Sequence, residues 1–287
     1  MLDQHPTEHH ALRVWLYGHP VDHSLSPGMH NAAFAEHQLP FEYVARDVPV
    51  ELLAEAVGDL RSSLVRGANI TLPHKQAVAP LLDELRAEAE KIGAVNTVVN
   101  EKGHLIGHNT DVAGFRQALR SVVPSGAKGL SCLVVGAGGA ARAVVAALLE
   151  DDSGRIRIVN RTMEHARLLC DSASRWGSAH CTPVPFSEAE EWVGQADLVV
   201  NATSLGLSGS VKDLPLRVDT LHGGQVLVDI VYRSSLTPLV ELARTKGIVA
   251  IDGKEMLLQQ AALSYEMWTG RRAPLDVMRE KIDNRAR

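Results

Sequence analysis

The sequence predicts an α/β protein of two domains, and three observations support this prediction. Strand-like and helix-like segments alternate along nearly all of the 287 residues, an order that builds largely parallel sheets with helices on their faces. One apolar strand runs directly into a glycine-rich turn and then a helix, as in dinucleotide-binding domains. The length fits one large or two modest domains of roughly 100–200 residues each.

The first 111 residues alternate between strand-like and helix-like segments. Apolar runs that end in glycine or polar residues predict strands, and Pro27 at an early helical position predicts a helix that opens at Ser26. The turn signal Lys102-Gly103 predicts that the strands on either side of it form a pair. The expected elements are strand Arg13–Gly18, the helix from Ser26, strand Phe41–Arg46, helix Val50–Leu60, and strands Arg66–Ile70, Val95–Asn100 and His104–Gly107.

A domain boundary is expected after Asp111, where a helical pattern over Val112–Ser121 leads into the turn-rich Pro124–Gly129. A second, cleaner series of elements follows. Leu130–Val135 is continuously apolar, which is typical of a strand buried on both faces. The other expected elements are helix Gly138–Glu150, strands Arg155–Val159, Leu198–Asn201 and Val226–Ile230, and a helical tail from Met256 to Arg287.

The charge and the apolar pattern exclude several classes of protein. The formal net charge is −5, with 29 Lys and Arg against 34 Asp and Glu, so no basic excess favours binding to nucleic acid. No apolar run approaches the ~18 residues needed to span a bilayer. The polar start MLDQHPTEHH lacks the apolar centre of a signal peptide. The sequence therefore predicts a cytoplasmic protein that binds neither nucleic acid nor membrane.

The cysteines and the N-terminal histidines do not predict a metal site. Cys132, Cys170 and Cys181 are odd in number and lack C-x-x-C spacing, so neither a disulfide framework nor a thiolate site is expected. Cys132 lies in an apolar run and is expected in the core. For the histidines at positions 5, 9 and 10, a disordered tail is favoured over weak metal binding.

The glycine-rich run Gly136–Ala141 follows the apolar strand and opens a helix. It fits the pattern G-x-G-x-x-G/A, in which small residues permit a tight turn, close approach of a pyrophosphate and close packing of helix on strand. The free N–H groups and the positive end of the helix favour the pyrophosphate. The alternative is a purely structural glycine turn. We expect a Rossmann-type dinucleotide-binding domain here.

The end of the next strand indicates which dinucleotide binds. NAD enzymes usually carry an acidic residue there, ~20 residues after the glycines, but this chain has Asn160-Arg161-Thr162. Arg161 offers a planar set of donors to a 2′-phosphate, and no carboxylate repels it. The alternative is that Arg161 is a solvated surface residue and Thr162 a helix cap. The location favours NADP.

Four polar loops follow strands of the first half. They are GHPVDHSLSP (18–27), GANITLPHK (67–75), GAVNT (93–97) and GHNTD (107–111). Each has a plain structural alternative, because Ser26 or Asp111 alone suits a helix cap and Lys75 alone suits the surface. Four such loops together indicate one shared crevice, since α/β sheets bind ligands at strand ends.

Taken together, these runs resemble the shikimate dehydrogenase family. The matching runs are GHPVDHSLSP, GANITLPHK, GAVNTV, GHNTD, GAGGAARA, NRT, NATSLG, DIVY, TPL and GKEMLLQQA. They occur in family order from about Gly18 to Gln260, so the resemblance covers nearly the whole chain. It implies a substrate-binding catalytic domain made of residues 1–111 and 253–287, and an NADP-binding domain of residues 112–252. The C-terminal helices would complete the substrate domain.

The resemblance implies NADPH-dependent, reversible reduction of 3-dehydroshikimate to shikimate in aromatic amino-acid (chorismate) biosynthesis. It implies catalytic roles for Lys75 and its partner Asp111. The residues implied in substrate binding are Ser24, Ser26, Thr71, Asn96, Tyr232 and Gln260. Those implied in cofactor binding are Gly136, Ala137, Gly138, Gly139, Ala140, Asn160, Arg161, Thr162, Thr203 and Gly253. No metal is implied, and the protein would act as a monomer or a homodimer.

Two assignments rest on local detail. Relatives often carry a second basic residue shortly after NRT, where this chain offers His165. We assign the substrate contact to Gln260 rather than Gln259, because Gln260 lies four residues after Met256.

The expected chemistry is hydride transfer to a carbonyl whose oxygen becomes negative, which requires a proton donor within reach. Lys75 would donate that proton, Asp111 would orient the lysine, and the serines with Tyr232 would anchor the substrate carboxylate. Two alternatives remain. One is a quinate/shikimate dehydrogenase with broader substrate or NAD use, and Asn160-Arg161-Thr162 argues against it. The other is a non-catalytic NADP-binding sensor, which would be expected to lack Lys75 or Asp111.

Overall fold

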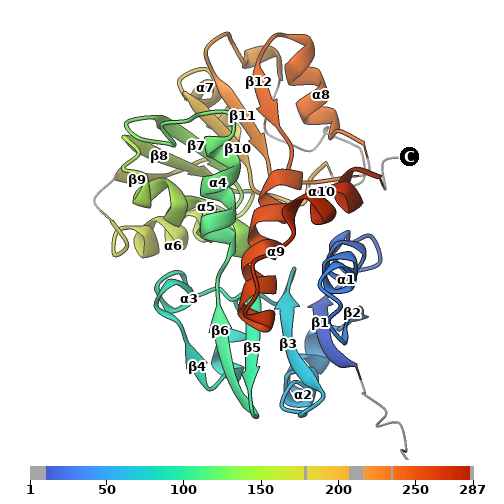
Figure 1. Cartoon of the computed structure of the whole chain (residues 1–287). Coiled ribbons are helices and arrows are strands. Elements are labelled where there is room, and N and C mark those ends of the chain that lie inside the picture. The colour runs from blue at the N-terminus through green and yellow to red at the C-terminus, as the bar shows by residue number, and fades with distance from the viewer. Residues whose placement is uncertain (1–10, 178–179, 207–215, 217, 234, 285–287) are drawn as a thin grey trace, which may run out of the picture.

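Two six-stranded sheets form the frame of the protein, one above the other in Figure 1. The computed structural model describes residues 11–177, 180–206, 216, 218–233 and 235–284. The α/β fold of two domains is confirmed, since one sheet uses strands from residues 12–108 and the other uses strands from residues 131–251. The histidines at positions 5, 9 and 10 lie outside the described residues.

The first sheet is mixed. Its strands are β1 (Leu12–Gly18), β2 (Phe41–Asp47), β3 (Val65–Ile70), β4 (Glu84–Leu85), β5 (Thr97–Glu101) and β6 (His104–His108), in the order β2-β1-β3-β5-β6-β4. Only β5 is antiparallel to its neighbours. The cause is the predicted turn, where Lys102 and Gly103 take φ values of 56° and 93° and reverse the chain.

The second sheet is parallel throughout. Its strands are β7 (Ser131–Val135), β8 (Arg155–Val159), β9 (His180–Val184), β10 (Leu198–Asn201), β11 (Val226–Asp229) and β12 (Val249–Ile251). Their order is β12-β11-β10-β7-β8-β9, which is the Rossmann order. The strand order reverses between β7 and β10, so ligands are expected at the carboxyl ends of these two strands.

Helices cover the sheets and join the two domains. They are α1 (Ser26–Glu36), α2 (Leu53–Asp59), α3 (Ala87–Ile92), α4 (Asp111–Arg120), α5 (Gly139–Glu150), α6 (Met163–Ala173), α7 (Ala189–Val193), α8 (Pro238–Thr245), α9 (Lys254–Thr269) and α10 (Leu275–Asn284). α4 packs against both α5 and α9, so it links the domains. α9 packs on β3 and β5, and α10 packs on α1, which returns the end of the chain to the first domain (Figure 1).

The core explains why the C-terminal helices return to the first sheet. Leu258, Tyr265 and Trp268 of α9 are at most 1% exposed and pack with Val14 and Met29. Burying a large apolar side chain contributes about 1.5–3 kcal/mol each. The Trp268 indole N–H also donates to the Val98 carbonyl at 3.0 Å, which fixes α9 across β5.

Several elements differ from the sequence expectations. The helix expected over Val50–Leu60 is a 3-10 turn at Val50–Leu52 followed by α2, which ends at Asp59. The strands β4, β9 and β12 were not predicted. They are short and partly exposed, so they lack the continuous apolar run that marked β7.

Candidate active site

A lysine and an aspartate form a partly buried ion pair at the centre of the candidate site. Lys75 lies in the loop after β3, and its Nζ is 2.6 Å from Oδ2 of Asp111, the first residue of α4. The two side chains are 17% and 5% exposed, so the solvent screens the pair weakly. Thr110 rather than Asp111 occupies the cap position of α4. The carboxylate therefore does not act as the helix cap, and it accepts the hydrogen bond of the lysine.

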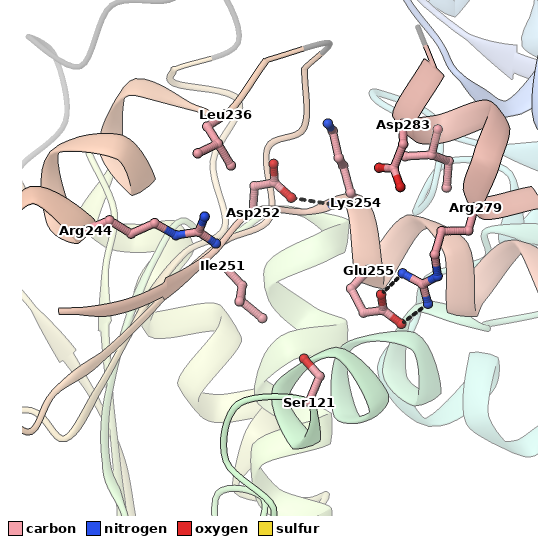
Figure 2. Close-up of a pocket in the computed structure, with 10 residues that line it drawn as sticks. Ser121, Leu236, Arg244, Ile251, Asp252, Lys254, Glu255, Arg279 and Asp283 are labelled. Carbon is pink, nitrogen blue, oxygen red and sulfur yellow. Dashed lines mark hydrogen bonds and ion pairs between the residues drawn. The ribbon is translucent and has the colours of Figure 1, made fainter. Parts of the chain in front are cut away.

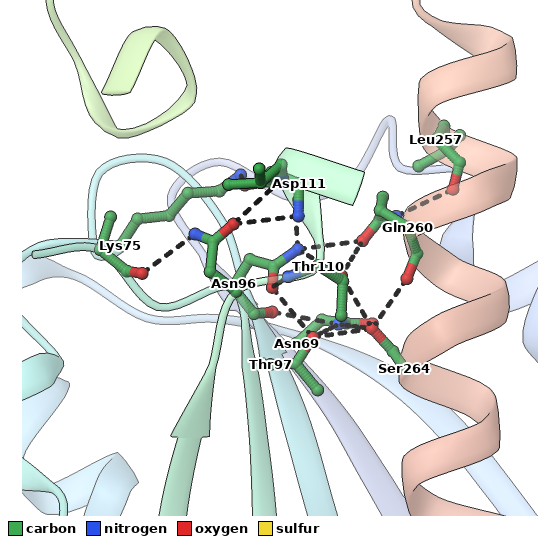
Figure 3. A network of polar contacts seen from close by, with 12 residues as sticks. Asn69, Lys75, Asn96, Thr97, Thr110, Asp111, Leu257, Gln260 and Ser264 are labelled. Carbon is green, nitrogen blue, oxygen red and sulfur yellow. Dashed lines mark hydrogen bonds and ion pairs between the residues drawn. The ribbon is translucent and has the colours of Figure 1, made fainter. Parts of the chain in front are cut away.

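Asn96 holds Asp111 from the other side (Figure 3). The Asn96 side chain lies just before β5 and is buried. Its Nδ2 is 3.0 Å from Oδ1 of Asp111 and 2.8 Å from Oγ1 of Thr110, and its Oδ1 accepts the Thr110 N–H at 2.8 Å. Each Asp111 oxygen thus has a different donor, which fixes the plane of the carboxylate.

α9 contributes Gln260 to the same network. Its Oε1 lies 3.2 Å from Nδ2 of Asn96, and its Nε2 donates to the Leu257 carbonyl one turn earlier in the helix. Gln259 instead donates to Glu255 at 2.8 Å. Of the two adjacent glutamines, Gln260 is therefore the one that reaches Asn96 and Thr110 (Figure 3).

A second row of buried polar groups supports Asn96 and Gln260 from behind. Asn69 of β3 donates to Thr97 Oγ1 and Ser264 Oγ, both at 3.1 Å, and accepts from Tyr43 OH at 2.8 Å. Ser264 donates in turn to the Gln260 carbonyl at 3.1 Å. Satisfied buried networks of this kind hold their members in one arrangement.

The predicted anchors Ser24, Ser26 and Tyr232 come together although they are distant in sequence. Ser26 is the first residue of α1, and its N–H donates to Ser24 Oγ at 3.2 Å. Burial raises the pKa of Tyr232, and its hydrogen bond with Ser24 opposes that shift. Burial also raises the pKa of Tyr43, opposed by its hydrogen bond with Ser26. Ser26 does not cap α1, since Leu25 occupies the cap position and Ser26 is the first residue of the helix.

Thr71 lies between Asn69 and Lys75, at the point where β3 ends. Its backbone N–H donates to the Tyr17 carbonyl at 2.8 Å, and the side chain is half-buried. The end of β3 and the loop after it thus carry four polar side chains within seven residues, as the strand-end argument predicted.

The glycine loop after β7 lies against the lysine. Gly136 has φ +114° and donates its N–H to the Val159 carbonyl at 2.7 Å, so the tight turn requires glycine. A Cβ on Gly138 would meet no atom within 4 Å, whereas one on Gly139 would lie 2.9 Å from Cβ of Lys75. The loop therefore leaves open space before the start of α5 and contacts the Lys75 stem directly.

The residues predicted to bind a 2′-phosphate lie at the surface. Asn160 Nδ2 donates to the Thr162 carbonyl at 2.9 Å, while Arg161 and Thr162 are exposed. Thr162 occupies the cap position of α6, but its side chain makes no cap bond. His165 is exposed in the first turn of the same helix. The donors of Arg161 make no hydrogen bond or ion pair with the other described residues.

Thr203 and Gly253 lie at the ends of the loops that follow β10 and β12. Thr203 Oγ1 donates to Asn201 Oδ1 at 2.7 Å, and its methyl group is beside Gly136. Gly253 precedes α9 and donates its N–H to the Val231 carbonyl at 2.9 Å. Both residues therefore lie at the carboxyl ends of the strands of the second sheet, the same edge at which the glycine loop follows β7.

A separate polar pocket of about 310 Å³ lies beside the start of α9 (Figure 2). Asp252 and Lys254 line it, and Glu255 is paired with Arg279 across it at 2.5 Å. None of the predicted substrate or cofactor residues lines this pocket. The Lys75 network is therefore the candidate active site.

Among the described residues, no three His, Cys, Asp or Glu side chains gather into a group that could hold a metal ion. Over the same part of the chain, no helix has the length and apolar character needed to cross a membrane.

Models of three related domains match successive parts of the chain. The shikimate dehydrogenase substrate-binding domain matches residues 16–98, shikimate/quinate 5-dehydrogenase matches residues 119–231, and the shikimate 5′-dehydrogenase C-terminal domain matches residues 253–282. A shikimate dehydrogenase (NADP⁺) of Methanopyrus kandleri is 42% identical over 272 residues, which cover 94% of each chain. The chain belongs to the shikimate dehydrogenase family.

Solved structures of the family agree with the fold. The shikimate 5-dehydrogenase of Thermus thermophilus, solved in complex with NADP(H) and shikimate, is 38% identical and has a TM-score of 0.83 over 96% of this chain and 99% of that one. The quinate dehydrogenase of Corynebacterium glutamicum, in complex with NAD, is 33% identical with a TM-score of 0.84, covering 94% and 98%. The fold is thus shared by members that differ in substrate and cofactor.

The sequence alone did not single out several side chains of the Lys75 network. Asn69, Thr97 and Thr110 lie within the quoted polar runs, yet no role was assigned to them. Ser264 and Tyr43 lie outside those runs. Their signal is weak because a single polar residue in an apolar helix or strand gives no indication of what it faces.

Proposed function

We propose that this chain is an NADP-dependent shikimate dehydrogenase that reversibly reduces 3-dehydroshikimate to shikimate in chorismate biosynthesis. One observation supports this most strongly: the Lys75–Asp111 pair lies against the glycine loop of the other domain, with Gly139 beside the lysine stem. A proton donor is thereby held next to the loop where a dinucleotide is expected. The membership of the chain in the family agrees with this proposal.

The residues of the second domain fit NADP. Gly136, Ala137, Gly138, Gly139 and Ala140 would hold the pyrophosphate, because the space before α5 is open and the first N–H groups of the helix point there. Asn160, Arg161 and Thr162 would hold the 2′-phosphate, and Thr203 would border the nicotinamide together with Gly253, the first residue of the C-terminal part of the substrate domain. NADPH, when bound, supplies the hydride that reduces the substrate carbonyl.

The residues of the first domain would hold the substrate and move the proton. Ser24 and Ser26, joined by Tyr232 from the second domain, would donate hydrogen bonds to the carboxylate, and Thr71, Asn96 and Gln260 would bind or position the ring hydroxyls. Lys75 Nζ would donate a proton to the carbonyl oxygen as it becomes negative, and would stabilise that charge beforehand. Asp111 and Asn96 would keep the ammonium in place through the contacts at 2.6 Å and 3.0 Å.

We assign residues 1–111 and 253–287 to the substrate domain and residues 112–252 to the NADP domain. α4 packs against α9 of the first part and α5 of the second, so it holds the two parts together. This arrangement suits a reaction between ligands held by different domains. The three cysteines are free thiols, which agrees with our proposal of a reducing compartment, the cytoplasm.

Initial rates with shikimate and with quinate, each with NADP⁺ and with NAD⁺, test the proposal. We expect the highest kcat/KM with shikimate and NADP⁺. Comparable kcat/KM values for quinate with NAD⁺ would instead assign the chain to the quinate/shikimate branch. Absence of turnover in all four assays, with NADP⁺ still binding, would indicate a non-catalytic sensor.

A further inference from the structure

Two cysteine thiols lie against each other in the second domain. Cys170, in α6, and Cys181, in β9, are 11 positions apart, and their Sγ atoms are separated by 3.0 Å. A disulfide bond is about 2.0 Å long, so the two sulfurs are about 1 Å from bonding distance. α6 packs directly on β9, and this packing rather than the local sequence brings the thiols together.

The two thiols differ in how easily a small molecule reaches them. Cys170 is 6% exposed and belongs to the core on one face of the second sheet, whereas Cys181 is half-buried at the margin of that core. Cys181 lies on β9, the edge strand, which pairs only with β8. A small oxidant therefore meets Cys181 first, and Cys170 is already in position to react with the product.

The third cysteine provides a natural contrast. Cys132 lies in β7, in the middle of the sheet, and is 1% exposed, and burial raises its pKa to about 12. Its thiol faces the Leu130 carbonyl at 3.6 Å, and no other cysteine is beside it. Because thiolate character and access control oxidation, Cys132 is expected to remain reduced.

We propose that Cys170 and Cys181 are a site of reversible oxidation, at which hydrogen peroxide closes a disulfide between α6 and β9. The Cys181 sulfur attacks the peroxide, the O–O bond breaks, and a sulfenic acid and one water form. The Cys170 sulfur then attacks that sulfenic sulfur, the S–O bond breaks, and a second water leaves. Overall, two thiols and one peroxide give one disulfide and two waters, and a dithiol such as dithiothreitol reverses the bond.

The oxidation is expected to be slow. The pKa of Cys181 is raised chiefly because its thiol donates a hydrogen bond to Cys170, and burial adds to the shift. Little thiolate is then present at neutral pH. The pair is therefore expected to respond to sustained peroxide rather than to a brief pulse.

Thiol counting and peptide mapping test the proposal directly. The folded protein is incubated with hydrogen peroxide, quenched with catalase, unfolded and titrated with a thiol reagent. We expect the count to fall from three thiols to one and to return to three after dithiothreitol. Trypsin cleaves after Arg167 and Arg175, so Cys170 and Cys181 fall on separate peptides, which should migrate as one linked species without reductant.

Matched variants separate this site from general oxidation. Cys170→Ser and Cys181→Ser should each abolish the linked peptide, whereas Cys132→Ser should still form it. The proposal is overturned if the wild-type protein keeps three thiols, if it forms disulfides between molecules, or if Cys181 ends as a sulfinic acid without a link. The thiol count and the linked peptide of the wild-type chain decide the proposal even if a variant fails to fold.

Discussion

The two regions proposed to bind ligands are built in opposite ways. Around Lys75 and Asp111 the side chains are largely buried and bound to one another before any ligand arrives. Around residues 160–162 the side chains lie at the surface, and Arg161 has no partner among the described residues. The geometry of the proposed proton transfer is thus set by packing, whereas the proposed recognition of the 2′-phosphate rests on exposed charge that solvent can screen.

The largest effect is expected at the buried pair. Lys75→Ala removes the proposed proton donor, and general acid catalysis typically contributes about 10²–10⁴-fold. We expect kcat to fall by that order while the Kd of shikimate, measured by calorimetry, changes little. Lys91→Ala is the matched control, because that lysine forms only a loose surface pair with Glu150 at 3.9 Å. Turnover at the wild-type level in Lys75→Ala would remove the catalytic role of this lysine.

A smaller and salt-dependent effect is expected at the exposed region. Arg161→Ala removes a charge-assisted contact worth about 1.5–3 kcal/mol, so KM for NADP⁺ should rise about 10–100-fold while KM for NAD⁺ changes little. The wild-type KM for NADP⁺ should also rise with ionic strength, because the site is exposed. Arg167→Ala, further along α6 and paired with Glu164, should leave both constants unchanged. Equal effects of Arg161→Ala on both cofactors would contradict the assignment.

The same contrast between an exposed loop and a buried network separates the residues that the sequence predicts from those that it does not. The Rossmann half was predictable because β7 and the glycine turn are local signals, in which apolar strand, turn and helix are consecutive. The loop at residues 160–162 was found in the same way, from its position after β8. The support behind the candidate active site was not, since Tyr43 and Asn69 meet across β1 of the first sheet, and Ser264 meets Asn69 through the packing of α9 on that sheet. No spacing rule relates residues on three separate elements.

The stability of the first domain should also depend on pH, because a histidine is buried in its core. His30 stacks on Tyr43 with ring centroids 4.5 Å apart, and burial lowers its pKa from 6.5 to about 3. Between these two pH values the unfolded chain binds more protons at His30 than the folded protein does. The contribution of His30 to the free energy of unfolding is therefore fully present above pH 6.5 and is lost as the pH falls toward 3.

His30→Leu tests this interpretation. Each pH unit in that window costs up to about 1.4 kcal/mol through a single group. His30→Leu should flatten the dependence of the free energy of unfolding on pH between 6.5 and 4, measured by urea denaturation. His104→Leu, at an exposed histidine of the first sheet, is the control for the loss of a surface imidazole. An unaltered slope in His30→Leu would show that other groups cause the acid sensitivity.

The smallest effect is expected where the two regions meet. Gly139→Ala places a methyl group 2.9 Å from Cβ of Lys75, and because a Cβ atom moves only with its backbone, the glycine loop or the Lys75 loop must shift to accommodate it. Because catalysis depends on the position of the proton donor, kcat should fall severalfold, with a small decrease in the melting temperature. Gly138→Ala is the counterpart, since its Cβ meets only open space on the cofactor side and should raise KM for NADP⁺ without lowering kcat. If both variants changed only KM, the glycine loop would act on the cofactor alone, and the contact with Lys75 would have no part in positioning the proton donor.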